Sequence, residues 1–336
     1  MKIKLLSTII AGVIIAGCGS DNNNSVAPEV KSASVQAYDG AIWGIQGSYN
    51  CGDGDNVVGL TNYNGFVETT DNVFVNTPEK CSFTFKPNGN VIPQDTSNGK
   101  YLPNLVLKAP KGLFAQGEAA TASPLSTLIA NKLGDNTYDE ATASQILEDL
   151  GLGEIANTCG ISVTDLLKDT DSAVKKLAEN PDFTDIHSKL IATTHVLADT
   201  LAAQPNASTD DVTKVTKLLA ESTLAEHPNY PKSKDEKPVH VELADILADE
   251  DTFTAAKNAE TVEDIQEITD LDKAIKNPAD SFTPEEPEDE NQPPTPPTTP
   301  EPPVKPEPPI EPPTGGTGGT GGTGGGDGSS GGGTGS

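Results

Sequence analysis

The sequence contains no arginine, and its 22 lysines face 50 aspartate and glutamate residues, so the formal net charge is −28. A chain this acidic repels the phosphate backbone of nucleic acids, and we therefore exclude nucleic acid as a partner. The acidic residues are spread along the chain, and the effect we expect from them is solubility.

Recognisable catalytic motifs are also missing. The sequence has no Gly-x-Ser-x-Gly, no His-Glu-x-x-His and no phosphate-binding loop. The four histidines are His187, His195, His227 and His240, and the first two are not spaced to share a helix face as metal ligands. We predict a non-enzymatic protein with no catalytic residues. A hydrolase whose residues converge only in the fold is an alternative.

Long hydrophobic runs are scarce, and the clearest lies near the start, between Leu5 and Ile15. It is shorter than the roughly 20 apolar residues that a membrane-spanning helix needs. Lys2 and Lys4 precede it, and a basic start followed by a short apolar run is typical of a secretory signal peptide. We predict that residues 1–17 form this signal.

The run ends Ile15-Ala16-Gly17-Cys18, which resembles the lipobox of bacterial lipoproteins. The resemblance implies cleavage before Cys18 and lipid attachment to its thiol, which would anchor the chain to a membrane. The alternative is an ordinary signal peptide followed by an unmodified cysteine. In Gram-negative lipoproteins an aspartate after the cysteine marks inner-membrane retention. Gly19 therefore implies the outer membrane, at its periplasmic face or the cell surface.

Three cysteines remain, and none has zinc-ligand spacing. An oxidising compartment permits disulfides, and we favour the pair Cys51–Cys81. On the chain-entropy model this bond stabilises the fold by roughly 3–4 kcal/mol. Cys159 is then left over, either buried or free.

The predicted fold is α+β and multi-domain, with a flexible tether (18–34) leading into a small β-sandwich (35–118). Short apolar runs separated by Asn-Gly pairs indicate strands, and Asn-Gly favours a type I′ turn in which both residues take positive φ. The runs are Val57-Val58, Val73-Phe74-Val75, Phe83-Thr84-Phe85 and Leu105-Val106-Leu107, and the pairs are Asn64-Gly65, Asn88-Gly89 and Asn98-Gly99.

From 119 to 277 the hydrophobic period becomes helical and predicts an α-helical bundle. Ser123-Pro124 marks one helix start, Gly151 marks a helix end, and Ser208 caps a later helix. The longest helix is expected at about 182–203, and two more at about 240–249 and 252–276. Each helix is expected to be amphipathic, with none apolar all round.

The end of the sequence predicts disorder. Residues 278–313 form an acidic, Pro-rich segment, with 14 prolines within 284–313, and we expect an extended stalk. Residues 314–336 include 14 glycines and are expected to form a flexible tail.

Several motifs resemble bacterial surface lipoproteins with a transthyretin-like or carboxypeptidase-regulatory-like β-sandwich. The residues that carry the resemblance are Tyr38-Asp39-Gly40, Thr61-Asn62-Tyr63-Asn64-Gly65, Asp95-Thr96-Ser97-Asn98-Gly99-Lys100 and Ser123-Pro124-Leu125-Ser126-Thr127-Leu128. The resemblance implies this sandwich followed by a helical segment, and surface placement. Asn62 departs from the aspartate that is usual there.

Two binding sites are considered. Asp53, Asp55 and Asn56 offer oxygen ligands around Gly54, which would suit calcium as the one candidate cofactor. The full twelve-residue calcium-ligand pattern is absent, and a solvated turn is the favoured interpretation of the loop. Trp43 with Tyr38 could stack on a glycan or pack the sandwich.

The leading prediction is a lipid-anchored cell-envelope lipoprotein for surface display, adhesion or a structural role. It would contact the membrane through its N-terminal lipid and bind a protein or glycan that the sequence does not identify. The alternative is a glycan- or calcium-dependent ligand-binding module.

Overall fold

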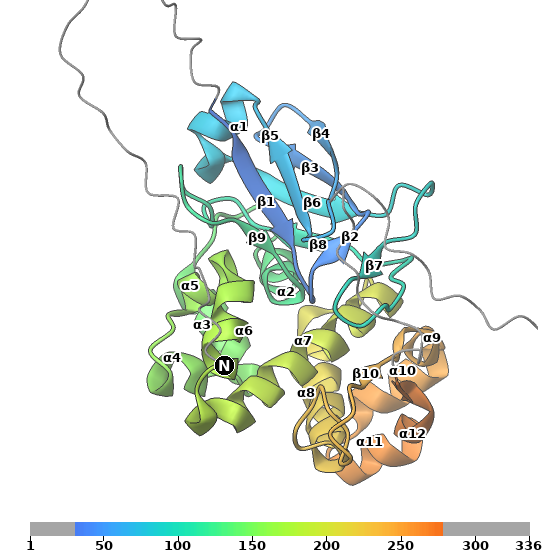
Figure 1. Ribbon diagram of the computed structural model, residues 1–336. Helices are drawn as coiled ribbons and strands as arrows, with labels where there is room; N and C mark the ends of the chain where they lie inside the picture. Colours follow the sequence, from blue (N-terminus) through green and yellow to red (C-terminus); the bar gives the residue numbers. More distant parts are fainter. Residues whose placement is uncertain (1–30, 278–336) are drawn as a thin grey trace, which may run out of the picture. The chain divides into compact units, whose positions relative to one another are not determined.

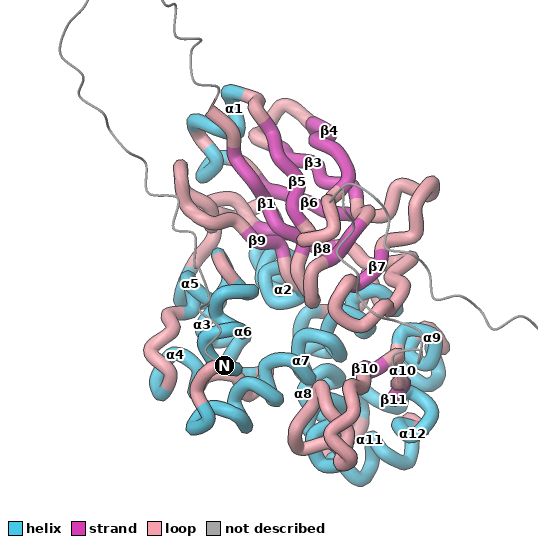
Figure 2. Tube along the Cα trace, viewed as in Figure 1, coloured by secondary structure: helices cyan, strands magenta, loops and turns pink. Residues whose placement is uncertain are grey.

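The computed structural model describes residues 31–277. The predicted signal peptide, Cys18, the Pro-rich stalk and the Gly-rich tail lie outside these residues. Most strands precede most helices along the described chain, so the α+β class is confirmed (Figures 1 and 2). Ala33 and Ser34, which were predicted to end the tether, already belong to strand β1 (Ala33–Ala37).

Two sheets account for most of the strands. The first is antiparallel, with the order β4-β3-β6-β8, and the second has the order β5-β1-β9, in which β1 and β9 run parallel. The bounds are β3 (Gln46–Asn50), β4 (Asp55–Leu60), β5 (Phe66–Thr69), β6 (Ser82–Lys86), β8 (Leu107–Ala109) and β9 (Thr121–Ala122). A separate pair joins β2 (Ile42–Trp43) to β7 (Gln94–Asp95).

The two sheets approach each other closely at Gly47 on β3. A Cβ atom at this position would lie 3.0 Å from side-chain atoms of Phe83 and Phe85 on β6 and of Val67 on β5. Phe83 and Phe85 are fully buried and alternate with the half-buried Thr84, as expected for a strand with one face in the core. Gly47 therefore lacks a side chain where the aromatic residues of one sheet meet the valine of the other.

The segment around Phe74, predicted as a strand, is instead the short helix α1 (Asn72–Asn76). The Asp71 side chain accepts a hydrogen bond from the Val73 backbone N–H and so caps the helix. The Phe74 ring packs between Tyr49 and Phe83, with centroids 5.1 and 5.5 Å away. Phe74 and Val75 are buried whereas Val73 is exposed, and the capped segment is helical. A 3₁₀ turn (Pro78–Lys80) follows.

The Asn-Gly pairs do form turns, although not of the predicted type. Gly65, Gly89 and Gly99 have φ of +80°, +80° and +81°. In the described chain, Glu236 is the one non-glycine residue with positive φ. The asparagines before these glycines therefore have negative φ. A type I′ turn needs positive φ at both central residues, so this assignment was wrong.

After α1, the next seven helices of the described chain follow β9 in sequence. They are α2 (Pro124–Leu133), α3 (Glu140–Asp149), α4 (Glu154–Thr158), α5 (Val163–Lys168), α6 (Thr170–Ala178), α7 (Thr184–Ala203) and α8 (Thr209–Glu226). The predicted caps are confirmed, because Ser123 and Ser208 accept hydrogen bonds from backbone N–H groups in the first turns of α2 and α8. The predicted stop at Gly151 is confirmed by its φ of +80°. Helices α4 to α6 had no sequence prediction.

The long helix α7 differs from the amphipathic helix that was expected. Every residue from Leu190 to Leu201 is buried, because α7 lies between two hydrophobic cores. Leu190 and Leu197 belong to a core that also includes the two sheets and helices α2 to α6, and Val196 belongs to a second core with α8 and the C-terminal helices. Polar residues on α7 are therefore buried as well.

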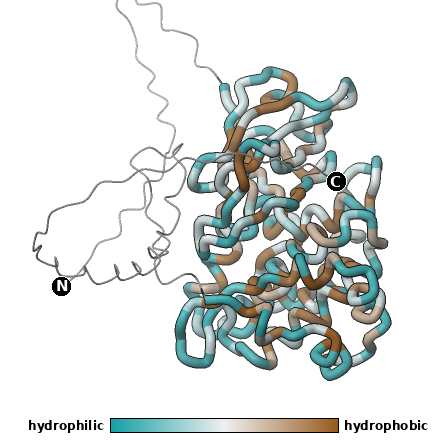
Figure 3. The backbone as a smooth tube through the Cα atoms, turned by 90° about the vertical axis from the view of Figure 1, so that its right-hand side faces the viewer, coloured by the Kyte–Doolittle hydropathy of each residue, from teal (hydrophilic) through white to brown (hydrophobic). Residues whose placement is uncertain are grey.

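The last part of the described chain is more broken than predicted. Its elements are β10 (His240–Val241), α9 (Ala244–Leu247), α10 (Glu250–Asn258), α11 (Val262–Ile268), α12 (Leu271–Ala274) and β11 (Ile275–Lys276), and β10 pairs with β11. The predicted single helix over 252–276 is interrupted because Thr261 starts a new capping box with Asp264. Hydrophobic and hydrophilic stretches alternate along the described chain (Figure 3). Within 31–277 no helix is long and apolar enough to cross a membrane.

Candidate functional site

The predicted disulfide Cys51–Cys81 is present. Cys51 directly follows β3 and Cys81 directly precedes β6, and the neighbouring residues Asn50 and Ser82 are register partners in the sheet. Strand pairing thus brings the two thiols together. Cys159 is a buried free cysteine, and burial raises the pKa of its thiol.

The predicted calcium loop lies in the β3–β4 hairpin, where Asp53, Asp55 and Asn56 are all exposed. Asp55 Oδ1 accepts a hydrogen bond from Asn50 Nδ2 at 3.1 Å, and Asn56 Nδ2 donates to the Gly54 carbonyl at 3.2 Å. Over residues 31–277, no group of three or more His, Cys, Asp or Glu side chains could hold a metal ion. A site built partly from Asn56 is not tested by that finding and stays a prediction.

A cluster of buried polar side chains lies elsewhere, where the β7 region meets α7 and β10. Its members are Asp39, Asp95, Lys100, His195, Asp199 and Tyr230, all buried except the half-buried Lys100, and we call them the Lys100 cluster. They come from segments far apart in the sequence. The sequence analysis assigned a site role to none of them.

A tight turn after β7 presents Lys100. The Asp95 carboxylate accepts hydrogen bonds from Ser97 N (2.8 Å), Ser97 Oγ (2.6 Å) and Asn98 Nδ2 (2.6 Å), and Gly99 N donates to the Asp95 carbonyl at 2.8 Å. Gly99 supplies the positive φ that ends the turn. This local network holds the turn and directs the Lys100 side chain away from solvent.

The Lys100 amine reaches helix α7 and strand β10. Its Nζ lies 2.6 Å from Asp199 Oδ1 and 2.7 Å from the Val241 carbonyl oxygen. The other Asp199 oxygen, Oδ2, accepts a hydrogen bond from Leu243 N at 2.7 Å. Lysine and aspartate side chains are 9% and 2% exposed, so the contact is shielded from water.

His195 and Tyr230 complete the helical side of the cluster. Tyr230 Oη lies 2.8 Å from His195 Nδ1 and accepts a hydrogen bond from Val241 N at 3.1 Å. The direction of the bond between the hydroxyl and Nδ1 depends on the imidazole tautomer. Burial, then the charges of Lys100 and His240, lower the pKa of His195 to about 3, so the ring is neutral at pH 7.

Asp39 and Asp95 are two buried carboxyl groups on the strand side. A Cβ on Gly40 would lie 2.3 Å from Asp95 Oδ1, so the Asp95 carboxyl group lies directly over the backbone beside Asp39. Burial raises the pKa of Asp95 to about 6. Burial, then the Asp95 charge, raises the pKa of Asp39 well above its usual value, and Asp39 Oδ1 is buried without a hydrogen-bond partner.

The other histidines and the aromatic pair have surroundings of their own. His240 Nε2 lies 3.1 Å from Glu242 Oε1, and burial lowers the pKa of the half-buried His187. Tyr38 and Trp43 are half-buried, and burial and then Asp171 raise the pKa of Tyr38. The glycan-stacking prediction for this pair is not tested.

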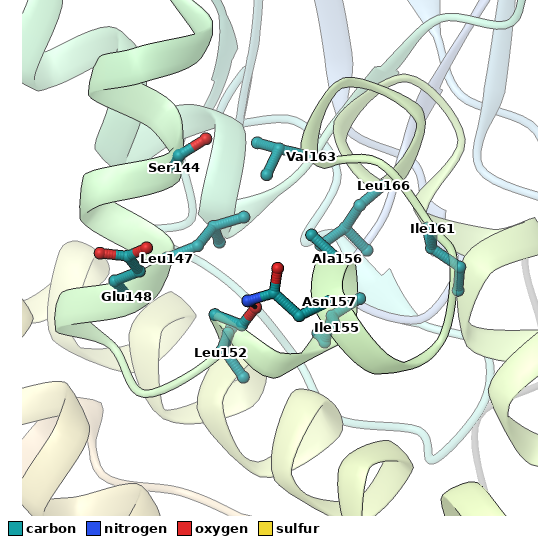
Figure 4. A pocket seen from close by; sticks show the side chains of 11 residues that line it. Ser144, Leu147, Glu148, Leu152, Ile155, Ala156, Asn157, Ile161, Val163 and Leu166 are labelled. Atoms are coloured by element: carbon teal, nitrogen blue, oxygen red, sulfur yellow. Dashed lines mark hydrogen bonds between the residues drawn. The ribbon is translucent and has the colours of Figure 1, made fainter.

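Two cavities in the described chain lie away from the Lys100 cluster. One of about 120 Å³ is enclosed by α3, α4 and α5 and is lined mainly by aliphatic side chains such as Leu147, Ile155 and Val163 (Figure 4). A more open groove of about 920 Å³ runs between β1 and the segment 114–121. The hydrogen bonds and ion pair of the Lys100 cluster therefore join buried groups of the protein to one another.

Comparison with known proteins adds no assignment, since no family model, no curated protein and no solved structure matches the chain. The resemblance to transthyretin-like surface lipoproteins therefore remains a prediction from the sequence.

Proposed function

We propose that the protein is a non-enzymatic lipoprotein of the bacterial cell envelope, anchored in the outer membrane through lipid on Cys18. The observation that carries the proposal is the basic, apolar and small-residue sequence that ends at Cys18. The disulfide Cys51–Cys81 supports it, because such bonds persist in exported proteins and are rare in the cytosol.

The folded part would serve in display, adhesion or a structural contact, as a small β-sandwich of the transthyretin-like type joined to a helical bundle. Two features of residues 31–277 support a rigid module of this kind. A single hydrophobic core includes residues of both sheets and of helices α2 to α7, and the Lys100 cluster adds polar links between strands and helices. Interaction with a partner would then use a surface of fixed shape.

The anchor is tested on the full chain in a Gram-negative host. Cells are labelled with a palmitate analogue, and membranes are extracted with detergent. We expect label on the wild-type protein and its loss, with release from the membrane, in Cys18→Ala. Cys159→Ala removes the buried free cysteine and is the matched control, which should remain labelled and membrane-bound. A Cys18→Ala protein that stays with the membrane contradicts the anchor.

A ligand-binding module is the second candidate. The observation that favours it is the groove of about 920 Å³, which exposes part of Phe66 and lies beside the buried rings of Phe74 and Phe114. A glycan could stack on the exposed part of Phe66, whereas calcium would use the hairpin loop. Calorimetric titration with calcium, and with envelope glycans, distinguishes the two forms, and absence of heat and of a melting shift in both counts against this candidate.

A further inference from the structure

We propose that Lys100 and Asp199 condense into an intramolecular amide bond between Nζ and Cγ, with loss of one water molecule. The bond would join the turn after β7 to helix α7, two segments that lie 99 positions apart in the chain. This inference concerns chemistry inside the fold and does not depend on the anchor at Cys18.

Proximity and burial distinguish this pair from other contacts between lysines and carboxylates. Lys132 and Asp210 approach to 2.8 Å, almost the same distance, but their side chains are 45% and 84% exposed. The Lys100–Asp199 contact at 2.6 Å is closed off from water. Two groups held in contact by the fold react as if at very high concentration. Exclusion of water also opposes the reverse hydrolysis.

The hydrogen-bond partners around the pair fit an amide better than they fit an ammonium ion. Protonated Lys100 carries three N–H donors, but within the described chain its Nζ has two acceptors, Asp199 Oδ1 and the Val241 carbonyl. A secondary amide needs one acceptor for its N–H group and one donor for its carbonyl oxygen. Val241 O at 2.7 Å would accept from the amide N–H, and Leu243 N at 2.7 Å already donates to Asp199 Oδ2, the future amide oxygen.

The reaction balances without any co-reactant. The Lys100 ammonium first transfers one proton to a carboxyl group of the cluster, and the neutral Nζ then attacks Cγ of Asp199. The negative charge that develops on Oδ2 is stabilised by the Leu243 N–H. The Cγ–Oδ1 bond then breaks, and Oδ1 leaves as water with two protons that come from the ammonium group. A buried ammonium and a buried carboxylate are replaced by one neutral amide, which removes the cost of keeping two charges out of water.

Asp39 is the carboxyl group placed to relay these protons. Its Oδ1 is buried and has no hydrogen-bond partner, and both Lys100 and Asp199 act electrostatically on it. Burial raises the pKa of Asp39 and so favours its protonated form, which could exchange a proton with the reacting pair. The Asp95 carboxyl group beside it is already engaged by Ser97 and Asn98.

The test is peptide mass spectrometry of the full-length protein after denaturation, reduction and digestion with trypsin. An acylated Lys100 resists cleavage, and Pro87 protects Lys86, so the wild type should give residues 81–108 joined to residues 190–214. The joined mass is smaller than the sum of the two peptides by one water. Lys132 is the internal control, since trypsin should cleave there normally and no peptide should join it to Asp210.

Variants assign the roles. Lys100→Arg and Asp199→Ala should lose the joined peptide completely. Asp39→Ala should lose most of it while keeping the native circular dichroism spectrum, and Asp39→Glu should restore it. Equal yields of the joined peptide in Asp39→Ala and the wild type would remove Asp39 from the mechanism. Wild-type protein that is cleaved after Lys100 and gives separate peptides shows an ion pair only and overturns the proposal, whatever the variants do.

Discussion

The β3–β4 hairpin and the Lys100 cluster both present aspartates, yet the two regions place them in opposite surroundings. In the hairpin, Asp53 and Asp55 face water, and Asp55 bonds to Asn50 only five residues away. In the cluster, Asp199 is buried and bonds to Lys100 and Leu243, which are 99 and 44 residues away. Asp55, which lies in a polar stretch of the sequence, thus makes a local contact. Asp199, which lies in an apolar stretch, links distant parts of the fold.

The largest effect is expected from breaking the buried pair. Asp199→Ala leaves the Lys100 amine buried without its carboxylate and leaves Leu243 N–H without an acceptor. The free energy of unfolding should fall by about 3–5 kcal/mol or more, as for other half-removed buried pairs. Urea denaturation followed by circular dichroism measures this. A loss below 1 kcal/mol, the range of exposed pairs, would contradict the comparison.

The second largest loss of stability is expected from removing the disulfide next to the hairpin. Cys51→Ala/Cys81→Ala opens a link between residues separated by 30 positions, and we expect a loss of roughly 3–4 kcal/mol because the unfolded chain gains freedom. The same urea titration, run on wild type with and without reductant, is the check. Reduction should destabilise the wild type and leave the double variant unchanged, and an effect on both would point to another thiol.

Removing the tyrosine hydroxyl is expected to have a smaller effect. Tyr230→Phe keeps the ring but leaves Val241 N–H and His195 Nδ1 without their shared partner. Two buried polar groups then lose a hydrogen bond, at a cost of about 1–3 kcal/mol. Thermal unfolding measures it, with Tyr101→Phe as control because Tyr101 is an exposed tyrosine. Equal melting temperatures for the two variants would show that the Tyr230 hydroxyl contributes nothing.

The pH dependence of the free energy of unfolding should reveal the titration of Asp95. Its folded pKa of about 6 lies above the ordinary value of 3.8, so the folded state binds the proton more tightly. This term makes the protein more stable as pH falls from about 6 to about 4, and Asp95→Asn should remove it. His195, whose pKa is lowered to about 3, has the opposite sign but is common to both proteins. The difference between their stability–pH profiles therefore reports Asp95 together with its electrostatic coupling to Asp39, and parallel profiles would contradict the assignment.

The smallest effect is expected in the hairpin. Asp55→Ala removes an exposed group with one local hydrogen bond, and no measurable change in melting temperature should follow in the presence of chelator. The same measurement with added calcium tests the loop as a metal site. A calcium-induced rise in the wild type that Asp55→Ala loses would make Asp55 a ligand, whereas identical curves leave the hairpin a solvated turn.

Much of the architecture could be read from local sequence signals. Ser123 and Ser208 correctly predicted two helix starts, and Gly151 correctly predicted a helix end. The spacing of the apolar residues distinguished the strand region from the helical region. The errors arose where a local cap outweighed the hydrophobic pattern. Asp71 caps helix α1 in a segment that was expected to be a strand. Thr261 caps helix α11 within a segment that was expected to be one continuous helix.

The candidate site was not predictable in the same way. Asp39, Asp95 and Lys100 belong to motifs noted only for a family resemblance, and Asp199 lies inside a helix expected to have a polar outer face. A helical period shows which residues share a face, but not whether a second core will cover the opposite face. Because α7 is covered by both cores, His195 and Asp199 became buried and required partners.

The sequence by itself therefore determined the α+β order of elements, the helix caps at Ser123 and Ser208 and the cysteine pair, because each depends on neighbours in the chain or on a small choice of partners. Only the tertiary structure decided which charged groups meet in the interior. Burial and partnership of Lys100, Asp39 and Asp199 depend on how strands and helices pack over long sequence separations, and no local pattern carries that information.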